Sequence, residues 1–448
     1  MKLKFQRIKS YKQLKIDVSN TISKINRISI LQIILFCLLL NFFSSWYFQQ
    51  IRGVNFGTSM GFFYLDTNCS NSHLSKINHC FGDFQIFLTS NVLSDDIQRA
   101  TELYPPASYI LFYPFSLINQ YFSIATFSYL LLAMVLNIFG SHLLLTKNRL
   151  RSNLFIWIVL NFSTLPLLVA FERGNSIIFV PFLVTLLLTG FLTSNTKYIT
   201  VSILLLLLVK PHYLLLLVAL LAMNKFRISI NILCAYIILN LIVSNMLYSN
   251  PFIFISKFLS SYSTLNATQK ISELWPINIS PLHTISKLGI KFGFIPNSLV
   301  YLLVSLFIFL LFVFYVRNEL ISKLDEKTIS IQLFVIFVTF CFTFVLYSHS
   351  PIYYLIFAFV FLYMYDFCLP PVGNLYFNFL FKLNLIFMTF YFPIFRSEAI
   401  LNRFGDEIKI FLTFNSYVLL FLNSVLFISF IVLIRGARIK IDKKILKP

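Results

Sequence analysis

The sequence predicts an all-α, polytopic membrane protein with about 12 transmembrane helices. Of its 448 residues, 58% are hydrophobic and only 12% are charged. Soluble domains are less apolar and carry about twice as many charged residues. Apolar runs that are long enough to cross a bilayer, about 18 residues or more, recur from one end of the chain to the other.

Both termini are predicted to be cytoplasmic. Residues 1–27 contain eight Lys or Arg and one Asp, and residues 435–448 contain six and one. Such flanks face the cytoplasm under the positive-inside rule. The basic start is too long for a cleavable signal, and the apolar run that follows it has spanning length. Because nucleic-acid-binding proteins carry their basic patch on a folded soluble face, the net charge of +20 does not predict a nucleic-acid partner.

Termini on one side of the membrane require an even number of crossings. This parity favours two short segments in place of one long span over residues 198–224, with a break at Lys210, Pro211 and His212. Pro211 supports the break, since proline removes a helical hydrogen bond and disfavours helix at the preceding residue. Irregular backbone at membrane depth needs a protein or water-filled surrounding, so Lys210 and His212 are expected at a polar cavity. The predicted spans are 28–48, 120–145, 152–170, 176–194, 198–209, 211–224, 228–247, 298–316, 328–346, 351–369, 378–395 and 410–434.

This order divides the connections between two sides of a single membrane unit, residues 1–448. The basic connectors 147–151, 224–227 and 317–327 fall inside. The apolar stretch 104–115 is too short for a comfortable crossing and is predicted to be an interfacial helix that leads into the second span. The segments predicted outside are the loop 49–106, which carries short amphipathic helices, the turn 172–175, the Lys210 tip, the loop 248–297, the turn 347–351 and the loop 396–409.

Asp83 is the candidate catalytic base. It lies in the acidic first outside loop between Phe81, Gly82 and Phe84, and aromatic surroundings disfavour a charged carboxylate and so raise its basicity. The alternative is a solvated aspartate that caps a helix beginning at Phe84. Asp66 is a weaker rival.

Cationic and hydrogen-bonding residues of the outside segments are candidates for binding a phosphate. The first candidate is Arg173, in the stretch Glu172–Arg173–Gly174–Asn175. In this stretch glycine permits a tight turn, and Asn175 can cap the next helix. Glu172 and Arg173 have an alternative as boundary residues that reach to water. Lys210 lies inside an apolar stretch, where ionisable residues are rare and usually functional. His212 and His349 are further candidates, and their alternative is a role as core or boundary histidines.

The sequence offers no motif for nucleotide or metal chemistry. The chain contains no glycine-rich phosphate loop and no HExxH or CxxC pattern, so no cofactor and no metal site are predicted. Cys69 and Cys80 share the first outside loop, and a disulfide between them stays open.

Three of these segments, in order, resemble the GT-C class of integral-membrane glycosyltransferases, most of all the family 87 group of polyprenol-phosphate-mannose-dependent mannosyltransferases. The matching residues are Asp83 followed by Tyr104, Pro105 and Pro106, then the turn from Glu172 to Asn175, then Lys210 and Pro211, with a looser match at "YSHSP", 347–351. The turn 172–175 is more basic than the family's usual Gly-Gln type, and the loop 248–297 has no counterpart.

The resemblance implies a GT-C fold and inverting transfer of a sugar, mannose-like or another, from a polyprenyl-phosphate donor to a glycolipid or glycan acceptor. Asp83 would be the base, and Tyr104, Glu172, Arg173, Asn175, Lys210, His212 and His349 would bind substrate. The expected location is a bacterial inner membrane, with the site on its extracytoplasmic face. Two alternatives are an O-antigen-type polysaccharide polymerase and a lipid or solute transporter; a scaffold protein is a third.

Overall fold

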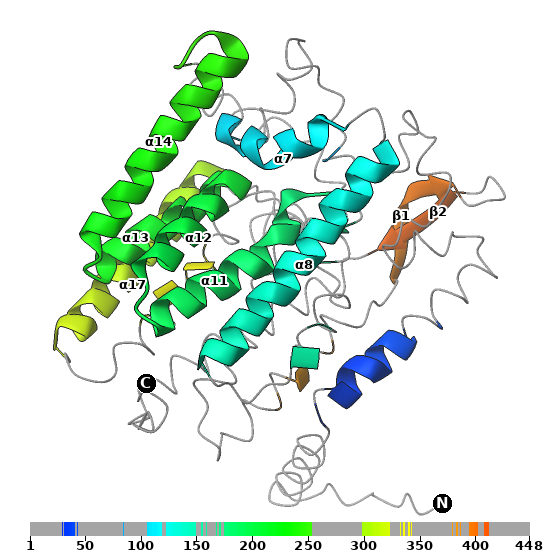
Figure 1. Ribbon diagram of the computed structural model, residues 1–448. Coiled ribbons are helices and arrows are strands. Elements are labelled where there is room, and N and C mark those ends of the chain that lie inside the picture. Colours follow the sequence, from blue (N-terminus) through cyan, green and yellow to red (C-terminus); the bar gives the residue numbers. More distant parts are fainter. Residues whose placement is uncertain are drawn as a thin grey trace, which may run out of the picture.

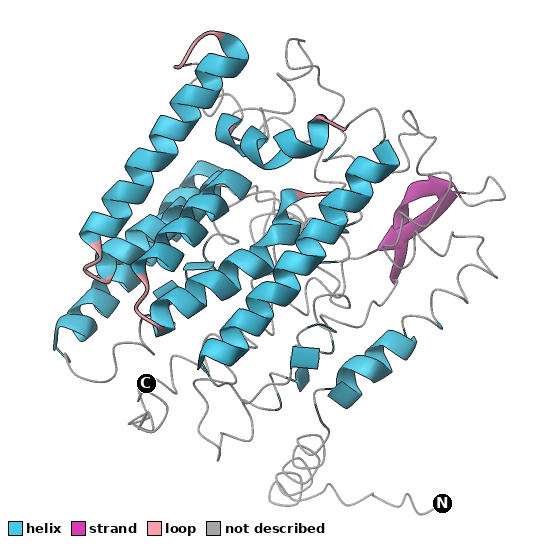
Figure 2. Cartoon of the chain, viewed as in Figure 1, coloured by secondary structure: helices cyan, strands magenta, loops and turns pink. Residues whose placement is uncertain are grey.

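The computed structural model is a helical bundle with one small β-hairpin (Figures 1 and 2). Among the described residues, two helices are long and apolar enough to cross a membrane, Ile124–Thr146 and Phe226–Tyr248. The structure describes residues 29, 31–40, 43, 84, 105–118, 122–148, 154–155, 158, 167, 170–171, 174–252, 298–322, 332, 335–336, 339–340, 342, 379, 382–383, 386, 394–401 and 407–411.

The helices of the described bundle follow the predicted spans closely. The second predicted span is α8 (Phe122–Asn148), and the fourth is a 3-10 turn η3 (Ser176–Phe179) that continues into α11 (Val180–Leu192). Next come α12 (Thr196–Val209), a second 3-10 turn η4 (Pro211–Leu214), α13 (Leu215–Ala222) and α14 (Phe226–Tyr248). α17 (Ser298–Ser322) completes the described bundle and extends past its predicted end. The span 351–369 and most of the spans 152–170, 328–346, 378–395 and 410–434 lie outside the described residues.

α8 and α11 pack closely side by side. A Cβ atom at Gly140 of α8 would overlap the Thr185 hydroxyl and lie 2.9 Å from the Phe182 ring of α11. Small residues that let two backbones approach are a common means of helix association in membranes, where lipid tails remove the usual hydrophobic drive. Asn137, one turn before Gly140, contacts Ile178 and Phe182. Because later residues of α8 meet later residues of α11, the two helices run in the same direction.

One turn type joins the helices. Gly174, Ser194 and Asn224 adopt positive φ angles of 62°, 53° and 56°. The N–H group after each donates to a carbonyl five residues earlier, from Asn175 to Ala170, Asn195 to Gly190 and Lys225 to Leu220. This is the Schellman ending, which satisfies carbonyls that a helix terminus leaves without partners. The tight turn predicted at Gly174 is confirmed.

The predicted helix break at Lys210 is also confirmed. α12 ends at Val209, Lys210 is extended with φ −155° and ψ 133°, and η4 starts at Pro211. At 1.5 Å per residue, α12 with its 14 residues is about 21 Å long. It is therefore too short to cross a hydrocarbon core of about 30 Å without help.

Contacts separate the bundle into two ends. The start of α12 lies beside the end of α11, where a Cβ at Gly190 would meet Ile199. The turn after α13 returns to the same place, since the Lys225 ammonium lies 5.7 Å from the Phe191 ring centre. α12 and α13 thus form a hairpin whose tip is Lys210, and both outer ends lie together. We call these the Lys210 end and the Lys225 end (Figure 1).

The interfacial helix predicted over 104–115 is a 3-10 turn η2 (Pro106–Ser108) followed by α7 (Tyr109–Ser116). α7 lies across the Lys210 end of the bundle (Figure 1). At about 12 Å its eight residues are too few to cross a bilayer.

The described bundle is helical, as predicted, and one short pair of strands lies beside it. β1 (Ile394–Leu401) and β2 (Glu407–Phe411) form an antiparallel hairpin. It occupies the predicted loop 396–409 and the adjoining tips of two predicted spans. Extended backbone here shortens the helix available to those spans, because the apolar residues 394 and 395 and the residues 410 and 411 belong to strands.

Candidate functional site

The structure describes three of the eight predicted site residues. Lys210, His212 and Asn175 are all at the Lys210 end and are buried, with 7%, 8% and 1% of their surface exposed. Asp83, Tyr104, Glu172, Arg173 and His349 lie outside the described residues.

The helix break at Lys210 leaves backbone carbonyls without helical hydrogen bonds inside an apolar bundle. Lys210 still donates its N–H to the carbonyl of Leu206, at 2.9 Å. Beyond it, the carbonyls of Leu208 and Val209 lose their regular helical donors, because the chain turns into the extended and 3-10 conformations. Buried carbonyls of this kind require partners from elsewhere.

Two serine hydroxyls from distant segments supply those partners. Ser108 Oγ donates to the Leu208 carbonyl. Ser176 Oγ donates to the Val209 carbonyl at 3.4 Å. Ser108 closely follows Pro105 and Pro106, and Ser176 directly follows the turn 172–175. Three stretches that are widely separated in sequence therefore meet at the backbone beside Lys210.

Asn240 of α14 forms a hydrogen bond that holds the segment Pro105–Ser108 against the bundle. Its Oδ1 accepts the N–H of Ala107 at 3.1 Å, and its Nδ2 donates to the Tyr236 carbonyl at 2.8 Å. The residue is fully buried. Sequence reasoning did not select it, although a lone amide in an apolar span is a recognisable signal for a hydrogen bond between helices.

The turn 172–175 leads directly into η3. Asn175 Oδ1 accepts the N–H of Ile177 at 3.1 Å, which confirms the predicted cap. This oxygen is thereby engaged by backbone, so Asn175 holds the turn in place. Arg173 precedes Gly174 in the chain, and the backbone of Gly174 is positioned by its hydrogen bond to Phe171, at 3.0 Å.

Phe84 lies in an aromatic cluster between α7, α8 and η3. Its ring stacks on Tyr129 with centres 4.2 Å apart, and it also contacts Phe112 and Phe115. Tyr129 in turn meets Phe179 edge-on at 5.3 Å. Phe84 is completely buried, so the chain next to Asp83 is anchored at the Lys210 end.

His212 is held among aromatic rings on the other side of the break. Its ring centre lies 4.8 Å from that of Tyr213, which contacts Phe340 at 5.6 Å. Within the described part of the chain, no three His, Cys, Asp or Glu side chains gather as metal ligands would. The chemistry that the described residues offer is a buried cation, hydroxyl and amide groups, and aromatic walls. This set is suited to holding an anion and a polar ligand.

Comparison of the chain with models of known protein families, with curated proteins and with solved structures gives no match.

Removing either serine hydroxyl at the break should destabilise the bundle. Ser108→Ala or Ser176→Ala leaves a buried carbonyl without its donor, which costs about 1–3 kcal/mol. The measurement is the melting temperature of the purified protein in detergent. Ser202→Ala is the matched control, since the buried Ser202 hydroxyl donates to Ile199 within α12, where the helical ladder serves that carbonyl anyway. Equal melting temperatures for all three variants would contradict the role of the two hydroxyls.

Proposed function

We propose that this chain is a GT-C-type glycosyltransferase of a bacterial inner membrane, with about 12 spans and both termini in the cytoplasm. It transfers a sugar from polyprenyl phosphate to a hydroxyl of a glycolipid or glycan on the extracytoplasmic face. The observation that carries the proposal is the meeting of three motifs at the Lys210 end. The segment that starts at Pro105, the residues that follow Gly174, and the Lys-Pro break come together through Ser108, Ser176 and the last carbonyls of α12.

The reaction requires a base, a binding site for the departing phosphate and correct alignment of the sugar. In our proposal Asp83 takes the proton of the acceptor hydroxyl as its oxygen attacks the anomeric carbon. The bond from that carbon to the phosphate oxygen breaks, the configuration inverts, and polyprenyl phosphate leaves. Lys210 and Arg173 hold the phosphate, because cations placed where charge develops stabilise the transition state.

Asp83 has support from its covalent neighbour. Consecutive Cα atoms are about 3.8 Å apart, and Phe84 is packed against Phe112, Phe115 and Tyr129 at the Lys210 end. We therefore propose that Asp83 acts at the end of the bundle where Lys210 lies. Tyr104 directly precedes the described Pro105, and we propose a role for it at the same end. His212, His349, Tyr104 and Glu172 complete the proposed set around the sugar and headgroup.

The relative order of the described connections also agrees with the proposed orientation. The start of α14 and the end of α17 lie at one end of the described bundle, while α7 lies at the other (Figure 1). The Ser176 hydroxyl bonds to the Val209 carbonyl, so the start of η3 also lies at the end where α7 is. Basic connectors belong on the cytoplasmic side. The Lys210 end would then face the extracytoplasmic leaflet.

The test is sugar transfer by the purified protein in nanodiscs, supplied with a panel of polyprenyl-phosphate sugars and extracted acceptor lipids. Asp83→Asn should lower transfer by about 10²- to 10⁴-fold, the usual contribution of a general base, while donor lipid still binds. Asp95→Asn, in the same loop, is the matched control and should retain activity. Equal transfer by wild type and Asp83→Asn would refute this base and turn attention to Asp66 or Glu172. Movement of lipid or solute across vesicles without any transfer would favour a transporter.

A further inference from the structure

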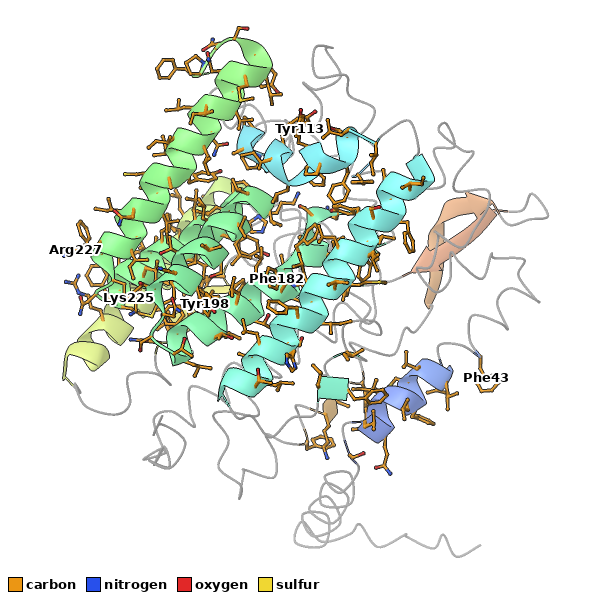
Figure 3. All side chains as sticks on the ribbon, viewed as in Figure 1. Phe43, Tyr113, Phe182, Tyr198, Lys225 and Arg227 are labelled. Atoms are coloured by element: carbon orange, nitrogen blue, oxygen red, sulfur yellow. The ribbon has the colours of Figure 1, made fainter. Side chains whose placement is uncertain are left out.

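The Lys225 end gathers basic side chains from separate elements. Lys197 starts α12, Lys225 and Arg227 lie at the start of α14, and Arg317 lies near the end of α17. Lys197, Arg227 and Arg317 are exposed and Lys225 is half-buried. Figure 3 labels Lys225 and Arg227 close together at this end, with Tyr198 nearby. Within the described helices, Glu319 of α17 is the only acidic residue.

Lys225 is held in place rather than freely extended into solvent. Its N–H closes the turn on Leu220 at 2.9 Å, and its ammonium lies 5.7 Å from the centre of the Phe191 ring. Burial lowers the pKa of the Lys225 ammonium. A neighbouring anion would favour the charged form and oppose that shift. The side chain is therefore fixed at a position where an anionic partner would be stabilising.

An exposed apolar surface begins directly beside Lys225 and Arg227. The outward face of α14 carries exposed apolar side chains from the residue before Arg227 to near the end of the helix, namely Phe226, Ile230, Leu233, Ile237, Ile238, Ile242 and Met246. At 1.5 Å per residue this face is about 30 Å long, which is the thickness of a bilayer hydrocarbon core. A partner that fits both parts must join an anionic group to long hydrocarbon chains.

We infer that the Lys225 end, centred on Lys225 and Arg227, binds the headgroup of an anionic glycerophospholipid whose acyl chains lie along the outward face of α14. Lys197 and Arg317 extend the same basic surface. The site is at the opposite end of the bundle from Lys210, and it does not depend on the proposed transfer reaction. Its ligand would be a structural lipid of the membrane leaflet that adjoins this end.

The experiment titrates the delipidated full-length protein in neutral detergent with phosphatidylglycerol or phosphatidylcholine. Bound lipid is counted by native mass spectrometry, and the melting temperature is followed in parallel. Wild type should bind phosphatidylglycerol in preference and melt at a higher temperature with it. Lys225→Gln with Arg227→Gln should weaken that preference by roughly fivefold for each charge removed, as expected for basic residues at an anionic surface.

Two control variants separate charge at this site from net charge and from folding. Lys257→Gln with Lys270→Gln removes the same charge from the loop 248–297, at the predicted opposite side, and should keep the preference. Lys225→Arg with Arg227→Lys preserves both charges and should also keep it. Equal phosphatidylglycerol binding by wild type and the double glutamine variant would overturn the inference. So would a site that takes polyprenyl phosphate in strong preference to phosphatidylglycerol.

Discussion

Asn137→Leu should lower the melting temperature more than any other single change in the described core. The Asn137 amide donates to the Ile178 carbonyl at 2.9 Å and accepts the Phe182 N–H at 2.9 Å. These two backbone groups are four residues apart and would bond to each other in a regular helix. The Asn137 side chain thus replaces one backbone hydrogen bond at the junction of η3 and α11, next to Pro181.

Leucine has a similar size but can neither donate nor accept a hydrogen bond. Two buried backbone groups would then be left without partners, at about 1–3 kcal/mol each, unless η3 rewound into regular helix. Thermal melting in detergent, followed by size-exclusion chromatography of the heated sample, measures the loss. Thr146→Val is the control, because the Thr146 hydroxyl is exposed and bonds only within α8. If Asn137→Leu melted at the same temperature as that control, the Ile178 carbonyl and the Phe182 N–H would have bonded to each other, which would contradict the prediction.

The features that the sequence predicted well are those set by local backbone chemistry. Pro211 ends α12 because it lacks an N–H, and Gly174 makes its turn because glycine tolerates a positive φ of 62°. Asn175 caps η3 through an interaction over two residues. Each effect is contained within a few neighbouring residues, so it can be recognised without knowledge of the fold.

The features that sequence reasoning missed depend on long-range partners. Ser108 meets Leu208 across 100 positions and Ala107 meets Asn240 across 133. A serine or asparagine in an apolar run indicates that some partner is needed but not which one. The β1–β2 hairpin also depends on pairing between two segments. Its strands are stabilised by pairing between Ala399 and Lys409 and their neighbours, and the apolar residues on either side were equally compatible with helix ends.

The prediction that tests the proposed site most directly concerns Lys210. Lys210→Met should lower sugar transfer by about 10²- to 10³-fold, the usual effect of removing one group that stabilises developing charge. Binding of a polyprenyl-phosphate sugar should weaken as well, since the phosphate loses a buried cation. Lys210→Arg should retain part of both activities, because it keeps the charge but changes the donor geometry. Lys197→Met is the matched control at the other end of the same helix, where the lysine is exposed, and should transfer sugar normally.

Stability and activity should move in opposite directions at this position. A lysine with 7% of its surface exposed costs desolvation energy, and replacing a buried charge by a well-packed apolar side chain is often neutral or stabilising. Lys210→Met is therefore expected to melt at the same temperature as wild type or higher while it loses transfer. A residue kept only for structure would behave differently: its loss would lower the melting temperature and leave the remaining folded protein active. That second pattern would remove Lys210 from the site and leave Arg173 as the candidate for the phosphate.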